Sequence, residues 1–504
     1  MKHFSLEFEK TVIDFAGVFG NCSEMIRKRY WCWILGVACV AGDVAARTWT
    51  DAETGRTIEA DLLAVQDDSV RLRRTDGKEF EVRLDMLSEA DQAFARAQKG
   101  KLGGGGGDWP TWRGPERTNR SPDQGLLKSW PDGGPKLLWT FADGGKGYSA
   151  PVIADGRLYF TGTRRGQAEI IGLDVATGKE VWSGTIGPDP EKGYSTGWGA
   201  GTRGAPTVDD GMIYAMSARG ILGAFDLRSG KKLWSKHLVD DLGGGIPGWG
   251  YSESPLVDGN RLVVTPGGGQ GAIAALDKKS GKLLWRSEEV KDGAQYASIT
   301  IAESGGAQHY VQLFMNKLVG VDPRSGDLNW SVDWPSGRTA VIPTPVPYED
   351  KVYMTSGYGS GCQLISYTAN GAKVLWENKV MKNHHGGVVR VGDYLYGFSD
   401  GAGLLCQNFK TGERVWSERG RDTQKGAVHY ADGMLYCLDE SNGSVFLVEA
   451  TPDGYREHGR FQLPAKTTLR EGTNGKIWTH PVVIGGKLYL RDQDHVFCYE
   501  VKGG

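Results

Sequence analysis

Cysteine is scarce in this chain, with seven residues among 504. No two are adjacent, and neither a CxxC pair nor a CxxCH sequence occurs. The chain therefore lacks the cysteine spacing of a zinc site and of a covalently attached haem. We expect the cysteines that follow residue 47 to be buried free thiols, and these are Cys362, Cys406, Cys437 and Cys498.

An excess of one charge sign is also missing. The 59 basic and 61 acidic residues leave a net charge of −2. Electrostatics therefore give no reason to expect a nucleic acid or an anionic membrane as partner. Neither an HExxH motif nor a Walker loop is present. The sequence predicts no metal site.

Long hydrophobic runs are absent too. The apolar stretch from Trp31 to Ala41 is about half as long as the ~20 residues that span a membrane. Three basic residues from Arg27 precede it, and Val44-Ala45-Ala46 follow it, which is the pattern of an export signal. We therefore interpret residues 1–46 as an extension and signal peptide that starts at Met25. The sequence predicts a periplasmic or cell-envelope protein without a membrane span in its mature chain; an uncleaved anchor is the alternative.

Glycine is abundant instead, with 75 residues. The string LDVATGKEVW returns as FDLRSGKKLW, LDKKSGKLLW, VDPRSGDLNW and QNFKTGERVW, and more weakly as YTANGAKVLW and PKLLW. The final tryptophans are 40 to 52 residues apart, a period typical of propeller blades. The Thr/Ser-Gly pair predicts a tight turn, and each tryptophan is expected to wedge between blades. These structural tryptophans are Trp139, Trp182, Trp234, Trp285, Trp330, Trp376 and Trp416.

A second repeat alternates with the first. Its pattern, as in PVIADGRLYF from Pro151, predicts two short strands joined by a polar turn. The two hairpins together make one four-stranded blade, and residues 108–502 hold eight such units. The seventh outer strand is degenerate at Phe461, and the last hairpin lacks its outer strand. We expect PKLLW, which ends at Trp139, to fill that place and close the ring; seven blades with one extra hairpin is the alternative.

Residues 47–97 form a separate small unit. Alternating strands are divided by TG, DD and DG turns, and Ser88 caps a short helix with Asp91 at the box position. The residues Arg47-Thr48-Trp49-Thr50 and Leu87-Ser88-Glu89-Ala90-Asp91 resemble the SHD1 family, which implies an SH3-like barrel. The glycine-rich residues 98–107 are expected to be a flexible linker.

The propeller repeats resemble the quinoprotein-type propellers with the tryptophan-docking motif. That superfamily includes PQQ-dependent alcohol dehydrogenases and the non-catalytic assembly factor BamB. The opening DWPTWRGPERTNRSPDQ, from Asp108, is similar to the start of exported PQQ-like repeat proteins of planctomycete-like genomes. The resemblance implies an all-β fold, an eight-bladed β-propeller. The dehydrogenases carry an adjacent cysteine pair over the quinone and a calcium set of Glu, Asn and Asp, neither of which we can place here.

Any central site must belong to the loops between one blade's outer strand and the next blade's inner strand. They bring aromatic, histidine and charged residues to the channel mouth, which favours a protein, small-molecule or carbohydrate ligand. Capping of the blade ends is the alternative role. Adjacent His384 and His385 are expected to point to opposite sides of an extended segment. The candidates are Tyr148, Arg203, Trp249, Tyr251, Glu253, Tyr296, Asn383, His384, His385, Lys425, Trp478 and His480.

Three functions fit these features. The sequence favours an exported, monomeric binding or scaffold protein without catalysis or cofactor. A dehydrogenase using PQQ and calcium is the alternative. A third hypothesis is a carbohydrate-active enzyme that pairs Glu253 with a second carboxylate at the mouth.

Overall fold

The computed structural model describes residues 47–65, 69–74, 78–98, 107–334, 338–420 and 423–503. The chain divides into two compact units, Met1–Gly106 and Gly107–Gly504. The predicted export signal, with its start at Met25, and residues 99–106 of the predicted linker lie outside the described residues. In the part of the chain that is described, no helix is long and apolar enough to cross a membrane.

The first unit is a four-stranded antiparallel sheet followed by one helix. Its core contains the fully buried Trp49, whose Nε1 donates to the Ala60 carbonyl at 3.0 Å. Ser88 caps the helix as predicted, because its Oγ accepts from the backbone N–H of Asp91 at 3.2 Å. The elements are β1 (Arg47–Thr50), β2 (Thr57–Val65), β3 (Ser69–Arg74), β4 (Glu79–Arg83), η1 (Leu84–Met86) and α2 (Glu89–Gln98).

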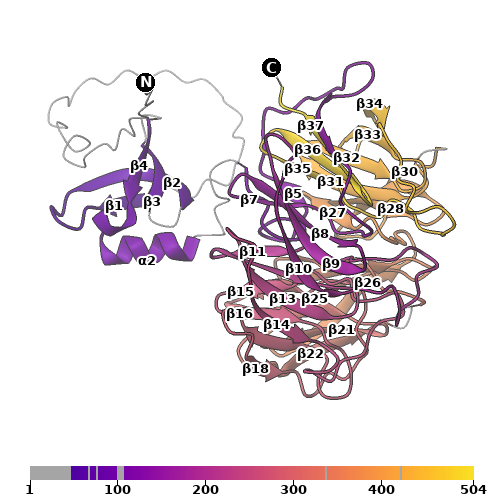
Figure 1. Cartoon of the computed structure of the whole chain (residues 1–504), viewed down its shortest axis with the longest axis horizontal. Helices are drawn as coiled ribbons and strands as arrows, with labels where there is room; N and C mark the ends of the chain where they lie inside the picture. Colours follow the sequence, from indigo (N-terminus) through magenta and orange to yellow (C-terminus); the bar gives the residue numbers. More distant parts are fainter. Residues whose placement is uncertain are drawn as a thin grey trace, which may run out of the picture. The chain divides into compact units, whose positions relative to one another are not determined.

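The second unit is a β-propeller whose described residues form eight sheets, numbered 1 to 8 here in chain order (Figure 1). Sheet 1 contains β7 (Val152–Ala154), β8 (Arg157–Arg164), β9 (Gln167–Asp174) and β10 (Glu180–Pro188). Sheet 2 contains β11 (Thr207–Asp209), β12 (Met212–Met216), β13 (Ile221–Asp226) and β14 (Lys232–His237). Sheet 3 contains β15 (Leu256–Asp258), β16 (Arg261–Val264), β17 (Ala274–Asp277) and β18 (Leu283–Arg286). Sheet 4 contains β19 (Thr300–Ser304), β20 (Ala307–Leu313), β21 (Lys317–Val321) and β22 (Leu328–Asp333).

The later sheets follow the same order, and the last two also take strands from the start of the unit. Sheet 5 contains β23 (Val346–Tyr348), β24 (Lys351–Ser356), β25 (Gly361–Thr368) and β26 (Gly371–Asn378). Sheet 6 contains β27 (Val388–Val391), β28 (Tyr394–Ser399), β29 (Gly403–Asn408) and β30 (Arg414–Glu418). Sheet 7 contains β5 (Arg120–Ser121), β31 (Gly426–Ala431), β32 (Met434–Asp439), β33 (Ser444–Glu449) and β34 (Glu457–Gln462). Sheet 8 contains β35 (Val482–Ile484), β36 (Lys487–Asp492), β37 (His495–Glu500) and β6 (Lys136–Phe141).

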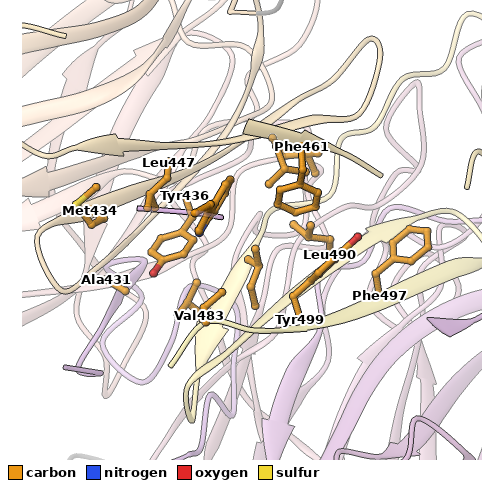
Figure 2. Packing of buried hydrophobic residues seen from close by; sticks show 14 of the residues in the cluster. Ala431, Met434, Tyr436, Leu447, Phe461, Val483, Leu490, Phe497 and Tyr499 are labelled. Atoms are coloured by element: carbon orange, nitrogen blue, oxygen red, sulfur yellow. The ribbon is translucent and has the colours of Figure 1, made fainter. Parts of the chain in front are cut away.

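The predicted ring closure is confirmed. Strand β6 pairs antiparallel with β37, with Trp139 opposite Cys498, so a strand from the start of the unit completes the last sheet. In Figure 1 the purple β5 likewise lies among the orange and yellow strands of sheets 7 and 8. Figure 2 shows how apolar side chains such as Tyr436 and Tyr499 fill the space between these two sheets. Closure therefore buries a continuous core where the two ends of the unit meet.

The repeated tryptophans join consecutive sheets through one recurring contact. Trp234 of sheet 2 packs on Gly281, in the turn between β17 and β18, and its Nε1 donates to the Lys278 carbonyl at 3.1 Å. A Cβ at Gly281 would lie 2.7 Å from the Trp234 ring, so the repeat needs glycine for close approach as well as for its φ of +69°. Five other tryptophans donate in the same way: Trp139, Trp182, Trp285, Trp376 and Trp416.

Trp330 departs from this expectation. Its Nε1 is buried without a hydrogen-bond partner among the described residues. The ring lies over Gly320 of its own sheet and beside Tyr367 of the next. The next turn reads TANGAK and lacks the Ser/Thr-Gly pair whose glycine lies against Trp139, Trp182, Trp234, Trp285 and Trp376.

A short segment at the start of the unit fills the central channel. Trp109 exchanges two backbone hydrogen bonds with Ile153 of sheet 1, and the Pro110 carbonyl accepts from Val208 of sheet 2. Arg117 donates to the Ile299 carbonyl at 2.7 Å, and Asn119 Nδ2 donates to Val428 at 2.6 Å. The segment thus binds innermost strands, or residues just before them, around the ring. We call residues 109–121 the channel segment.

The expected environment of the cysteines is confirmed for those that the structure describes. Cys362, Cys406, Cys437 and Cys498 are buried free thiols, each in a strand of a different sheet. Burial raises the pKa of the Cys406 and Cys498 thiols to about 12, so they stay protonated and unreactive.

Candidate functional site

The mouth of the propeller contains a cavity of about 530 Å³. The channel segment lines it through Trp112 and Arg113, and the connections between sheets supply much of its wall. Nine of the twelve residues predicted from those connections line this cavity: Tyr148, Arg203, Trp249, Tyr296, His384, His385, Lys425, Trp478 and His480.

The other three predicted residues do not line the cavity. The Tyr251 hydroxyl is buried and donates to the Pro266 carbonyl at 2.7 Å. The Glu253 carboxylate is 2 % exposed and accepts from the backbone N–H and the hydroxyl of Thr265. Asn383 is fully buried and donates to two backbone carbonyls. All three side chains support the blade ends.

The expectation that His384 and His385 point to opposite sides is wrong. Both rings line the cavity, and they stack on each other with centroids 4.2 Å apart and planes 10° apart. The segment is not a strand, because β27 begins only at Val388, so the alternation of an extended chain does not apply. Trp478 stacks on the other face of His385, at 4.3 Å and 21°.

This aromatic stack is held by charged groups behind it. Lys425 Nζ lies 2.8 Å from one oxygen of Asp400 and 3.1 Å from Nδ1 of His384. Burial alone would raise the pKa of Asp400, but its contacts with His384 and Lys425 hold that pKa well below the usual range. The carboxylate therefore stays ionised and fixes Lys425 at the cavity wall.

Glu440 holds the other end of the stack. One of its oxygens accepts from Trp478 Nε1 at 3.1 Å and lies 3.7 Å from Nδ1 of His385. Burial lowers the pKa of His385 to about 4 and that of His480 to about 3. Both rings are therefore neutral at pH 7 and present flat, uncharged faces.

A second group of lining residues is built around Arg203. Its Nε donates to the Trp249 carbonyl at 2.6 Å, its Nη2 donates to Gly199, and its guanidinium lies 5.0 Å from the Tyr148 ring centroid. The Tyr296 hydroxyl accepts from the Trp249 backbone N–H at 3.2 Å. These contacts hold the Arg203 guanidinium and the Tyr296 ring in place.

Several lining residues were not predicted from the sequence. Tyr358 and Glu440 lie in the turns between the second and third strands of sheets 5 and 7. In a four-stranded meander those turns end on the same side as the connections to the next sheet, so topology alone could have indicated them. Trp112 and Arg113 belong to the channel segment, whose partners lie far away in sequence.

One further motif lies close to the mouth. Residues 193–197 read GYSTG, which has the GxSxG spacing of a hydrolase nucleophile turn. No helix follows this stretch, and the backbone N–H of Ser195 donates to the Gly248 carbonyl at 2.7 Å. The strand–turn–helix setting that activates such a serine is therefore not present.

The eight sheets and the loop-lined mouth define a tryptophan-docked propeller with a central cavity. The chain belongs to the family described as outer membrane protein assembly factor BamB, whose family model matches residues 123–244 and 191–418. The SLA1 homology domain 1 family, SHD1, matches residues 42–102.

Individual relatives include both kinds of protein that share these repeats. The outer membrane protein assembly factor BamB of Burkholderia pseudomallei is 26% identical over 372 residues, which cover 71% of this chain and 85% of that protein. The quinoprotein alcohol dehydrogenase PedH of Pseudomonas putida is 23% identical over 61% of this chain but only 49% of its own length. The chain thus spans about half of that dehydrogenase.

Solved structures show the same fold. BamB from Moraxella catarrhalis superposes with a TM-score of 0.52 at 15% identity, covering 73% of this chain and 99% of that chain. The computationally designed Ika8 protein superposes with a TM-score of 0.51 at 11% identity, covering 73% of this chain and all of that one.

Proposed function

We propose that this chain is an exported, non-catalytic binding propeller, which holds a small ligand or part of a partner protein in its mouth cavity. The observation that carries the proposal is the convergence of side chains from separate sheets and from the channel segment on one cavity. Flat aromatic walls with a few fixed polar groups are typical of binding sites. Kinship with an outer membrane protein assembly factor supports export and a binding role.

A calcium-bound quinone does not fit this cavity. Calcium takes about six to eight oxygen ligands, whereas Glu440 is the one carboxylate in the described lining and already accepts from Trp478. The fixed cation Lys425 would repel a second cation. None of the four described cysteines lines the cavity. The residues therefore disfavour the PQQ-dependent dehydrogenase.

The hypothesis of a carbohydrate-active enzyme relied on Glu253 as one of two carboxylates at the mouth. Burial raises the pKa of Glu253 to about 7, which is a value suited to a general acid. However, this carboxylate lies outside the cavity and is hydrogen-bonded to Thr265, so it cannot reach a bound glycoside.

The proposed function is tested by ligand-observed NMR with a mixture of neutral, anionic and cationic aromatic fragments. We expect saturation transfer to a subset of fragments with the wild-type chain and its reduction at least threefold in Trp198→Ala and Trp478→Ala. Leu233→Ala is the matched control, because Leu233 is also a large exposed apolar residue, on β14 and away from the mouth. Unchanged saturation transfer in both tryptophan variants would contradict a binding site at the mouth.

A further inference from the structure

The floor of the mouth cavity contains a buried arginine without a counter-ion. Arg113 is 2 % exposed, and its guanidinium donates to the carbonyls of Arg117, Thr118 and Val388. Its Nη1 is buried and has no hydrogen-bond partner among the described residues. No carboxylate of the described chain pairs with it, and burial lowers its pKa to about 10. An unpaired buried charge of this kind is costly in the absence of a ligand.

The wall of the cavity contains a second arginine without a counter-ion, Arg203. Arg203 donates through Nε and Nη2 to backbone carbonyls, and it forms no ion pair with a described carboxylate. It lies against the Tyr148 ring, which orients the guanidinium without neutralising it. Arg203 and Arg113 therefore present two positive charges to the same cavity.

The remaining charges of the described lining do not balance these arginines. Lys425 and Lys476 also line the cavity, against the single carboxylate of Glu440. Asp400 lies behind the wall and is paired with Lys425. Because Asp400 balances Lys425, the charges of Arg113, Arg203 and Lys476 remain against that of Glu440, although the chain as a whole has a net charge of −2. The lining of the cavity therefore carries a net positive charge, whereas the net charge of the whole chain is negative.

The shape of the site restricts the rest of the ligand. The stacked rings of His384, His385 and Trp478 form one flat wall, and Trp249 with Tyr296 forms another aromatic patch. Ring faces of this kind bind flat groups by stacking. The Nε and Nη2 atoms of both arginines already donate to backbone carbonyls, which leaves Nη1 of each to donate to a carboxylate oxygen.

We propose that the mouth cavity binds a carboxylate carried on an aromatic or otherwise flat body, with the carboxylate facing Arg113 and Arg203. This inference rests on the proposed function and names the chemical class of its ligand. The carboxylate could come from a free small molecule or from the C-terminal residue of a peptide, and both sources share the same recognition chemistry.

The inference is tested by isothermal titration with matched acid and amide probes. Indole-3-acetate is compared with indole-3-acetamide, and N-acetyl-Gly-Gly-Trp with its C-terminal amide. We expect each acid to bind at least tenfold more tightly than its amide, and the tighter of the two acids identifies the source. We also expect raised salt to weaken acid binding, because the attraction is between charges.

Substitutions of arginine test which charge causes the preference for the acid over the amide. Arg203→Gln should weaken binding of the acid at least fivefold and leave the amide unchanged, and Arg203→Lys should retain part of the preference. Arg414→Gln is the control, since it removes the same charge from an exposed site on β30. Thermal unfolding of each variant shows whether it is folded at the temperature of titration.

Two results would overturn the inference. Equal affinity for acid and amide would reject the carboxylate but retain the proposed function, because a ligand would still occupy the mouth. Binding of neither acid would also reject it, and the neutral and cationic fragments of the NMR experiment would then decide the proposed function separately.

Discussion

At the scale of single residues, the glycine and the tryptophan of the repeat occur together because they pack against each other across neighbouring sheets. In five of the repeats, the glycine in one sheet's last turn is the surface on which the preceding sheet's tryptophan lies, as Gly281 does for Trp234. A methyl group there meets a ring rather than solvent. The repeat therefore encodes contacts between blades as well as turns within them.

We expect Gly281→Ala to destabilise the propeller more than Gly259→Ala does. Both glycines have positive φ, +69° and +59°, so both alanines incur the left-handed backbone cost of about 1–2 kcal/mol. Only at Gly281 would the new Cβ also meet the Trp234 ring, which adds about 1–3 kcal/mol of overpacking. Urea unfolding of the two variants measures the difference. Equal losses would show that Trp234 does not depend on close approach to this glycine.

At the scale of elements, the channel segment connects the innermost strands of several sheets through hydrogen bonds. Its hydrogen bonds reach partners that are up to 310 residues away in sequence. His429 of β31 shows how tightly it is fitted: Nδ1 lies 3.0 Å from the Asn119 side-chain oxygen, and Nε2 accepts from the Val483 backbone N–H. Those partners require the neutral ring with its proton on Nδ1.

Because His429 must stay neutral in the folded chain, we expect the stability of the propeller to fall at acidic pH. Burial lowers the pKa of His429 to about 3, from an unfolded value of about 6.5. Because the unfolded chain binds the proton more readily, stability falls as the pH drops through 6.5 and continues to fall toward 3. Between pH 7 and pH 5 this one group should account for a loss of about 2 kcal/mol.

The measurement is urea unfolding of the wild-type chain and His429→Gln at both pH values. The variant keeps an amide donor and acceptor but has no ring to titrate, so it should lose less stability on acidification. Other groups contribute to both proteins alike: Glu253, whose pKa is raised to about 7, stabilises the fold as the pH falls. The same acid-induced loss in both proteins would contradict the assignment of His429.

The sequence predicted what is periodic and local. Blade order, ring closure at Trp139 and most of the mouth followed from repeats and from the topology of a meander. Tyr251 was misplaced because its ring turns inward over Gly220, a contact that no spacing reveals. Arg113 was missed because its partner Val388 is 275 residues away and belongs to no repeat. Charge and aromatic type therefore identified the mouth, whereas non-local packing decided which side chains reach it.

At the scale of the whole molecule, the chain is expected to behave as two cooperative units. The units Met1–Gly106 and Gly107–Gly504 each have buried cores of their own. We expect two calorimetric transitions, with the larger one belonging to the propeller. Removal of residues 1–106 should leave that transition within about 2 °C of its original midpoint. A shift well beyond this would show that the small unit stabilises the propeller.

The mouth cavity is the proposed binding site of this protein. Its most direct test is a set of crystals of the full chain soaked with aromatic acids, neutral aromatics and aliphatic amines. We expect electron density for the aromatic acids in the cavity that Trp249 and Trp478 line, with the carboxylate toward Arg203. Fragments that gather at other surfaces while the cavity holds only water would contradict it.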